Sequence, residues 1–182
     1  MKKWILLSLA LIVALGIFVR PALAQETLEV EVKEEIEYDL AWPGLLPDHP
    51  LYRLKMIRDK IWGFLIRDPL KKSQWCLLMA DKRIWAAQLL MEKGKFDLAV
   101  STATKAEKYL ERAVDRAYQA KEMGGGDNVF FEKILNASLK HEEILQEIQQ
   151  NFPEELKSTI EEIREYPKSV NQKMLMLLSE EQ

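Results

Sequence analysis

The 182-residue chain contains only one cysteine, Cys76. A disulfide within the chain is therefore impossible, and packing alone must hold the fold together. The three residues before Cys76, Ser73-Gln74-Trp75, do not form a lipobox, so we expect no lipid on its sulfur. We expect Cys76 to be a small, buried apolar side chain.

Histidine is almost as scarce, which argues against a metal site. His49 and His141 are the two histidines, and they lie far apart in the chain. His141-Glu142 begins like the zinc-protease sequence H-E-x-x-H, but Leu145 stands where the second histidine belongs. Neither histidine follows a glutamate by three residues, as a di-iron bundle requires. The sequence predicts no metal and no cofactor, and we expect His141 to be a half-buried packing residue.

The motifs of common enzymes are also missing. The chain has no G-x-S-x-G sequence and no phosphate-binding loop. Gly124-Gly125-Gly126 precedes a predicted helix, as anion-binding loops do, but it has neither a strand before it nor a basic residue beside it. We interpret it as a flexible linker. The sequence predicts no catalytic residues, and we expect a protein that is not an enzyme.

Two groups of charged residues are candidates for polar sites. Asp81 and Arg83 fit a solvated pair at the edge of a helix, or alternatively a buried polar pair. A basic stripe occupies the third predicted helix, with acidic residues interleaved beside it: Lys105, Lys108, Arg112 and Arg116, beside Glu107, Glu111 and Asp115. This interleaving predicts a salt-bridged surface rather than a nucleic-acid site.

The N-terminus has the pattern of a secretory signal. Lys2 and Lys3 precede an apolar run over residues 4–19, and Ala22-Leu23-Ala24 is a small-x-small cleavage site. We predict a signal peptide over residues 1–24 and a mature chain beginning at Gln25, exported to the periplasm or the extracellular space. An alternative is an uncleaved membrane anchor, although sixteen residues span roughly 24 Å of a hydrocarbon core about 30 Å thick.

Residues 25–41 carry seven acidic residues and one lysine. We interpret them as an acidic, extended, mostly disordered spacer. A docking strip for a basic partner is the alternative.

Residues 42–182 predict one all-α domain, a bundle of about five helices. The first helix is expected over residues 50–66, with one apolar stripe: Leu54, Ile57, Ile61 and Leu65. The second is expected over residues 69–93, with two apolar seams: Cys76, Ala80, Ile84, Ala87 and Met91 on one, Leu78, Trp85 and Leu89 on the other. A helix apolar on two sides should be central.

Gly94 is expected to end this second helix, and the short turn after it predicts a central antiparallel hairpin. The third helix, capped by Asp97, carries small apolar residues at alternating spacings of four and three: Ala99, Ala103, Ala106, Leu110, Ala113, Ala117 and Ala120. Such a seam lets two helix backbones approach closely.

The triple glycine at 124–126 separates the first three predicted helices from two further ones, and the two halves of the domain have opposite net charges. Residues 42–126 have a net charge of +6, and residues 127–182 have −6. The fourth helix is capped by Asp127 and is expected to bury Phe131, Ile134, Leu145, Ile148 and Phe152. The last segment is expected to be a helix kinked at Pro167, or two nearly collinear helices. Attraction between the halves favours one domain, and two lobes hinged at the glycines are the alternative.

The stretch Trp42–Lys55 contains three of the seven prolines. Proline restricts its own φ and the conformation of the residue before it, so Pro43, Pro47 and Pro50 predict a bent, rigid entry to the first helix. We expect Asp48 to cap that helix and the stretch to carry no ligand.

These residues also carry a resemblance. The sequence Pro43-Gly44-x-Leu46-Pro47-Asp48-x-Pro50-x-Tyr52-x-Leu54-Lys55, with Asp68-Pro69, Ala80-Asp81 and Gly94-Lys95, resembles a bacterial family of exported, all-helical domains of unknown function. The resemblance covers residues 43–121. It implies export and helices, and it implies no activity.

We therefore expect a non-catalytic interaction or scaffold module of the bacterial cell envelope, with a protein partner. The alternative is a periplasmic chaperone-like or stress-sensing protein with an apolar groove, for which Met174, Met176 and Leu178 are candidate exposed residues.

Overall fold

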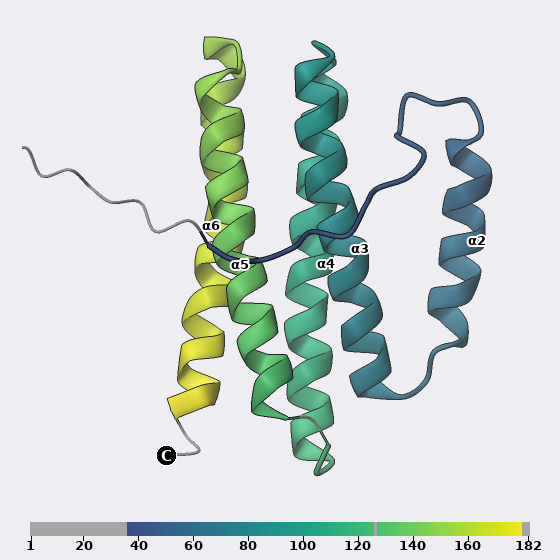
Figure 1. Ribbon diagram of the computed structural model, residues 1–182, viewed down its shortest axis with the longest axis vertical. Helices are drawn as coiled ribbons and strands as arrows, with labels where there is room; N and C mark the ends of the chain where they lie inside the picture. The colour runs from purple at the N-terminus through teal and green to yellow at the C-terminus, as the bar shows by residue number, and fades with distance from the viewer. Residues whose placement is uncertain (1–35, 126, 180–182) are drawn as a thin grey trace, which may run out of the picture. The chain divides into compact units, whose positions relative to one another are not determined.

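The computed structural model describes residues 36–125 and 127–179. Within these residues the chain forms five helices and no strand: α2 (Tyr52–Leu65), α3 (Pro69–Glu92), α4 (Phe96–Glu122), α5 (Asn128–Gln150) and α6 (Glu154–Ser179). This confirms the predicted all-α bundle (Figure 1). The predicted signal peptide and residues 25–35 of the predicted spacer lie outside the described residues.

Helices α3 and α4 form the most extensive pair, which is the predicted hairpin. Gly94 has φ 70° and permits the turn, because only glycine adopts this conformation without steric cost. The N–H of Lys95 donates to the carbonyl of Leu90 at 2.9 Å, and that of Gly94 donates to Met91 at 2.8 Å. These two bonds make a Schellman C-cap. Every residue of the predicted α4 seam is at most 3% exposed.

The second predicted seam of α3 is wrong. Leu78 is 39% exposed, and Trp85 and Leu89 are only partly buried. The buried residues Leu77, Ala80 and Ala86 instead lie on one continuous arc that covers roughly half of the helix circumference. Helices α4 and α5 therefore contact neighbouring sides of α3 rather than opposite sides.

Helices α5 and α6 pack on this hairpin and complete a four-helix bundle. Asp127 caps α5 as predicted, since its Oδ1 accepts from the N–H of Phe130 at 2.7 Å. All five residues predicted for the buried face of α5 are at most 4% exposed. Helix α6 continues through the buried Pro167, also as predicted.

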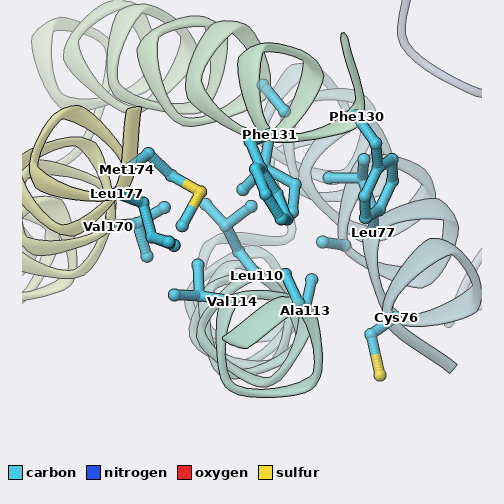
Figure 2. Packing of buried hydrophobic residues seen from close by; sticks show 14 residues of the cluster. Cys76, Leu77, Leu110, Ala113, Val114, Phe130, Phe131, Val170, Met174 and Leu177 are labelled. Carbon is cyan, nitrogen blue, oxygen red and sulfur yellow. The ribbon is translucent and has the colours of Figure 1, made fainter. Parts of the chain in front are cut away.

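Two apolar clusters fill the bundle, and each contains residues from α3, α4, α5 and α6. The second also contains a residue of the turn before α6. In the first, Leu110 of α4 lies near Phe131 of α5 and Met174 of α6 (Figure 2). The second contains Ile84, Ala103, Ile148 and Ile160. Met174 was expected to be exposed, but it is fully buried. Met176 is exposed as expected, at 63%.

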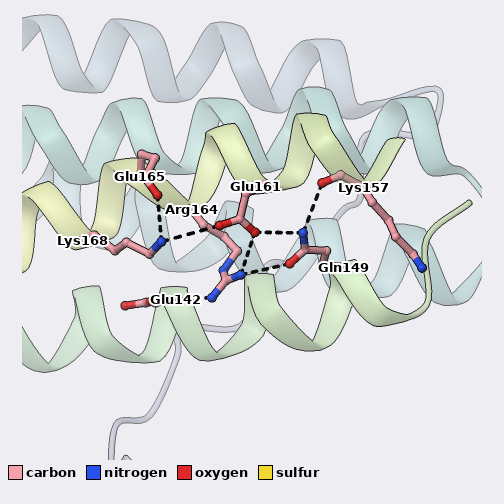
Figure 3. A network of polar contacts seen from close by, with 7 residues as sticks. All are labelled: Glu142, Gln149, Lys157, Glu161, Arg164, Glu165 and Lys168. Atoms are coloured by element: carbon pink, nitrogen blue, oxygen red, sulfur yellow. Dashed lines mark hydrogen bonds and ion pairs between the residues drawn. The ribbon is translucent and has the colours of Figure 1, made fainter. Parts of the chain in front are cut away.

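A polar network lies at the edge between α5 and α6 (Figure 3). Arg164 donates to the side-chain oxygens of Gln149 at 3.0 Å and Glu161 at 2.8 Å, and it lies 3.6 Å from Glu142. Gln149 also donates to Glu161 at 2.9 Å. Because most of these groups are partly exposed, water screens the pairs and each adds little stability.

Two of the predicted N-caps are wrong. Helix α2 begins after Leu51 without a side-chain cap, and α4 begins after Lys95, also without one. Asp97 lies in the first turn of α4, where its charge favours the helix dipole. Asp48 instead pairs with the ammonium groups of Lys95 at 2.9 Å and Lys93 at 3.2 Å, so it ties the entry stretch to the α3–α4 turn.

The chain before α2 contributes to the core. Residues 36–41 form neither helix nor strand and cross the bundle (Figure 1). Tyr38 packs on the first apolar cluster and Leu40 on the second. The Lys55 ammonium of α2 donates to the carbonyls of Pro43 and Leu45, which holds the proline-rich stretch against that helix. Among the helices of the described residues, none is long and apolar enough to cross a membrane.

Candidate functional site

The first candidate surface is the outer face of α2. The predicted apolar stripe of this helix is not buried, contrary to expectation: Leu54, Ile57, Ile61 and Leu65 are 56–64% exposed. Trp62 is 64% exposed and Phe64 is 85% exposed. We call these six residues, together with Leu51 just before the helix, the α2 outer face. It is the largest group of exposed bulky apolar side chains within the described residues.

The inner side of α2 explains why the stripe points outward. The buried residues of this helix are Asp59 and Gly63. A Cβ on Gly63 would overlap the Trp75 ring of α3, so glycine lets that ring lie directly on the α2 backbone. This contact commits the side carrying Gly63 to the bundle, and the apolar stripe lies on the opposite side.

A groove adjoins the outer face, between α2, α3 and α4. Its volume is about 710 Å³. Ile61 and Phe64 of the outer face are also part of its wall, and Trp75 and Tyr109 stand edge to face with ring centroids 5.7 Å apart. Cys76 also lines it. The walls are thus largely aromatic and aliphatic.

Basic side chains surround this groove. Lys60, Lys72, Arg112 and Arg116 line it, and Asp115 is the acidic residue among the lining residues. Within the described residues, the ion pairs expected along α4 are not formed: Arg112 lies 5.4 Å from the centre of the Tyr109 ring, and Arg116 donates to Gln119. Glu107, which was expected on the same solvated surface, is fully buried. The groove therefore combines apolar walls with a positively charged rim.

The second candidate is a buried polar cluster at the centre of the bundle. His141 of α5 contacts Glu107 Oε1 of α4 through Nδ1 at 2.9 Å and Asp81 Oδ1 of α3 through Nε2 at 3.3 Å. Tyr38 donates its hydroxyl to Asp81 Oδ2 at 2.9 Å. His141 and Glu107 are fully buried, so the expectation of a half-buried His141 is wrong.

The charges of this cluster favour a protonated histidine. Burial by itself lowers the pKa of His141, but Glu107 and Asp81 together outweigh it and raise that pKa to about 9. Burial and then Asp81 raise the pKa of Tyr38 above its usual range, so its hydroxyl keeps the proton it donates. At neutral pH the imidazolium donates to one carboxylate on each side.

The same geometry limits what the cluster does chemically. Both ring nitrogens of His141 are occupied, and the ring is sealed from solvent. The two carboxylates lie at opposite nitrogens and cannot converge on one ion with the ring. Within the described residues no group of three histidine, cysteine or acidic side chains is arranged to hold a metal. The cluster joins four segments of the chain, which suits a structural role.

The remaining sequence candidates lie apart from one another. Asp81 and Arg83 do not pair: Arg83 donates to the Met79 carbonyl at 2.8 Å and stacks 4.2 Å from the Tyr109 ring centre. Burial raises the pKa of the Cys76 thiol, which opposes formation of a reactive thiolate. Gly124 has φ 75° and ends α4 in a second Schellman motif, so it acts as a helix cap.

Comparison with models of known protein families gives a match to one domain family. Residues 44–155 match the model of a family described as a domain of unknown function, DUF5667. The chain belongs to this family. No curated protein and no solved structure matches the chain.

The DUF5667 match begins in the proline-rich stretch that carried the resemblance and extends beyond residue 121, through α5. It therefore includes the α2 outer face, the groove, and the Asp81, Glu107 and His141 side chains. Most of α6 and the Tyr38 hydroxyl, which completes the buried cluster, lie outside it.

The sequence contained one overlooked signal for the orientation of α2. Gly63 lies in the interior of a helix, where it costs about 1 kcal/mol relative to alanine, so it indicates a close contact on its own side. Glu107 also had a weak signal for burial, since it stands four residues after Ala103 and three before Leu110, both in the predicted seam of small and apolar residues.

Proposed function

We propose that this DUF5667 protein is an exported, non-catalytic interaction module of the cell envelope, and that the α2 outer face with the adjoining groove is its docking surface. The observation that carries the proposal is the exposure of seven bulky apolar side chains on and just before one helix. Large contiguous apolar patches on a protein surface mark sites where another molecule binds.

The way α2 is attached supports this assignment. Its contact with the bundle is narrow, and the wide apolar side faces outward. A helix that served only to complete the core would bury this side instead. The apolar stripe is thus available to a second molecule. In the isolated domain it is exposed to water, which is unfavourable for apolar side chains.

The buried cluster supports a non-catalytic role. A general acid or base must come within hydrogen-bond reach of its substrate. His141 is enclosed and bonded at both nitrogens, whereas the groove has cations and one carboxylate around apolar walls. The groove is therefore better suited to binding than to proton transfer.

Export is part of the proposal and rests on residues 1–24. The intact mass of the protein recovered from expressing cells tests it. We expect a chain beginning at Gln25, and a mass that includes the first 24 residues would support the anchored alternative.

A second candidate function is chaperone-like binding of many clients, and the 710 Å³ apolar-walled groove favours it. The expected row of exposed apolar residues on the C-terminal helix supports this function less. In the described residues, the large apolar side chains exposed on α6 are Leu175 and Met176. A chaperone would capture many partners, whereas an interaction module would capture one or a few.

Photo-crosslinking in cells tests the docking surface. A photoreactive residue at Ile57 or Phe64, both exposed on α2, should give defined adducts in the envelope. Val129 on α5 is the matched control, because it is 75% exposed and lies outside the α2 outer face. Adducts at the α2 positions and none at Val129 are expected. Equal labelling at all three positions, or none at α2, would refute the proposal.

A further inference from the structure

We propose that the α2 outer face docks on the anionic surface of a lipid bilayer. This inference rests on the proposed function, because it names the partner of the same docking surface. It follows from the arrangement of apolar and basic side chains on α2 and beside it.

The apolar residues form a face of the kind that interfacial helices bury in lipid. At 100° per residue, the positions from Phe64 through Leu54 to Trp62 cover roughly 160° of the helix surface, and the exposed Arg58 is the charged residue within this arc. The opposite side carries Asp59 and Gly63 and is held by the bundle. A helix of this type lies in the plane of the interface, with its apolar side chains about 5–10 Å into the boundary between headgroups and acyl chains.

The charge around this face is strongly positive. Residues 52–72 contain seven lysine or arginine residues and two aspartates, a net charge of +5. Arg53, Lys60 and Arg67 form no ion pair within the described residues. Each basic side chain held near an anionic lipid surface strengthens binding about fivefold.

The groove extends the same pattern beyond α2. Its wall shares Ile61 and Phe64 with the outer face, and its rim carries Lys72 and Arg112 from α3 and α4. Phosphate headgroups on this rim and acyl chains against the outer face would contact one continuous surface. The basic side chains therefore lie where an anionic headgroup layer would meet the bundle.

Other occupants fit less well. A second copy docking through the same face would bring together two copies of residues 52–72, each with a net charge of +5, which like-charge repulsion opposes. A protein partner would need a deep groove to cover an apolar arc of roughly 160°. A bilayer covers a convex face without a preformed groove, because lipid adapts to its shape.

Vesicle co-sedimentation tests the inference. The exported chain is recovered from cells, its N-terminus is checked by mass, and it is mixed with vesicles of equal phosphatidylglycerol and phosphatidylcholine or of phosphatidylcholine alone. We expect binding to the anionic vesicles and at least tenfold weaker binding to the neutral ones. Raising the salt concentration from 0.1 M to 0.5 M should weaken the anionic binding, because it screens the charges.

Substitutions then assign the binding to α2. Phe64→Glu should weaken binding to the anionic vesicles more than tenfold, and Lys60→Gln about fivefold. Val129→Glu makes a similar apolar-to-acidic change on α5 and should leave binding within twofold. Since all variants share one N-terminus, any contribution from residues 1–24 is the same in each.

The outcomes separate this inference from the proposed function. No vesicle binding, together with protein adducts from Ile57 in cells, would overturn the lipid inference and leave the docking surface in place. A dimer in sedimentation velocity that Phe64→Glu abolishes would assign the face to a second copy and overturn it too. Vesicle binding that Phe64→Glu and Lys60→Gln leave unchanged would also overturn it. Failure of both vesicle binding and crosslinking would refute both proposals.

Discussion

Raising the pH from 6.5 to 9 should weaken the bundle through the buried His141. Its pKa of about 9 in the folded protein exceeds its ordinary value of 6.5. Below pH 6.5 the ring is protonated in both states, and its stabilising effect is fully present. Between 6.5 and 9 the unfolded chain loses the proton that the folded protein keeps, and the effect is lost as the pH rises.

The magnitude follows from the same two values. One unit of pKa corresponds to about 1.4 kcal/mol, so the free energy of unfolding should fall on the order of 3 kcal/mol across this interval. Burial opposes the charge on His141, and the contacts with Glu107 at 2.9 Å and Asp81 at 3.3 Å more than compensate. The dependence should level off above pH 9.

Urea denaturation followed by circular dichroism at pH 6.5, 7.75 and 9 measures this fall. His49→Gln is the matched control, because it removes the other histidine and should retain the slope. His141→Gln should abolish it. Since this variant leaves the buried carboxylates without their cation and could unfold, an NMR titration of the His141 ring in the unaltered protein provides an independent measurement.

Other groups do not imitate this result. Burial raises the pKa of Tyr38 and of Cys76, so their effects begin near their ordinary values of 10.0 and 9.0, at or above the upper end of the interval. Burial lowers the pKa of Lys55, which gives a dependence of opposite sign that His141→Gln leaves in place. A slope that is the same with and without His141, or a ring that titrates below pH 7, would refute the reasoning.

Three further predictions concern packing and the entry stretch. Ala106→Leu adds three carbons to a fully buried position and should cost about 1–3 kcal/mol of unfolding free energy by urea denaturation; an unchanged value would contradict the close seam. Gly63→Ala should increase amide hydrogen exchange throughout α2 while α3–α6 stay protected, because the new methyl overlaps the Trp75 ring; slower exchange in α2 would show that helix propensity outweighs the clash. Asp48→Ala should lower the free energy of unfolding by less than about 1 kcal/mol, since it breaks partly exposed ion pairs. Lys95→Ala should lower it by a similar amount. A loss of stability in Asp48→Ala alone would indicate that Asp48 caps a helix.

Much of the fold was predictable because its signals are local. Gly94 and Asp127 mark helix ends through backbone conformation and a short-range hydrogen bond, and both predictions are confirmed. The α4 seam was equally clear, since a spacing of four and three places its small residues on one side of the helix. These features depend on neighbours within a few residues.

The candidate docking surface was not predictable in the same way. An apolar stripe that includes Ile57 and Ile61 has the same spacing in the sequence whether it packs against a core or faces outward. The preference of Asp48 for Lys95 over a helix N-terminus likewise depends on a residue that is distant in sequence. Periodicity identified the apolar side of α2 and could not say what covers it.

The sequence by itself determined the helices, most of their ends, the α3–α4 hairpin and the buried side of α5, because hydrophobic period and capping act over one or two turns. Only the tertiary structure decided which side of α2 meets the bundle, where the Trp75 ring lies on Gly63. It also decided that Glu107 lies beside His141 in the core. Contacts between residues far apart in the chain outweigh local pattern in both cases, since steric fit at a glycine and the pairing of buried charges depend on what faces them.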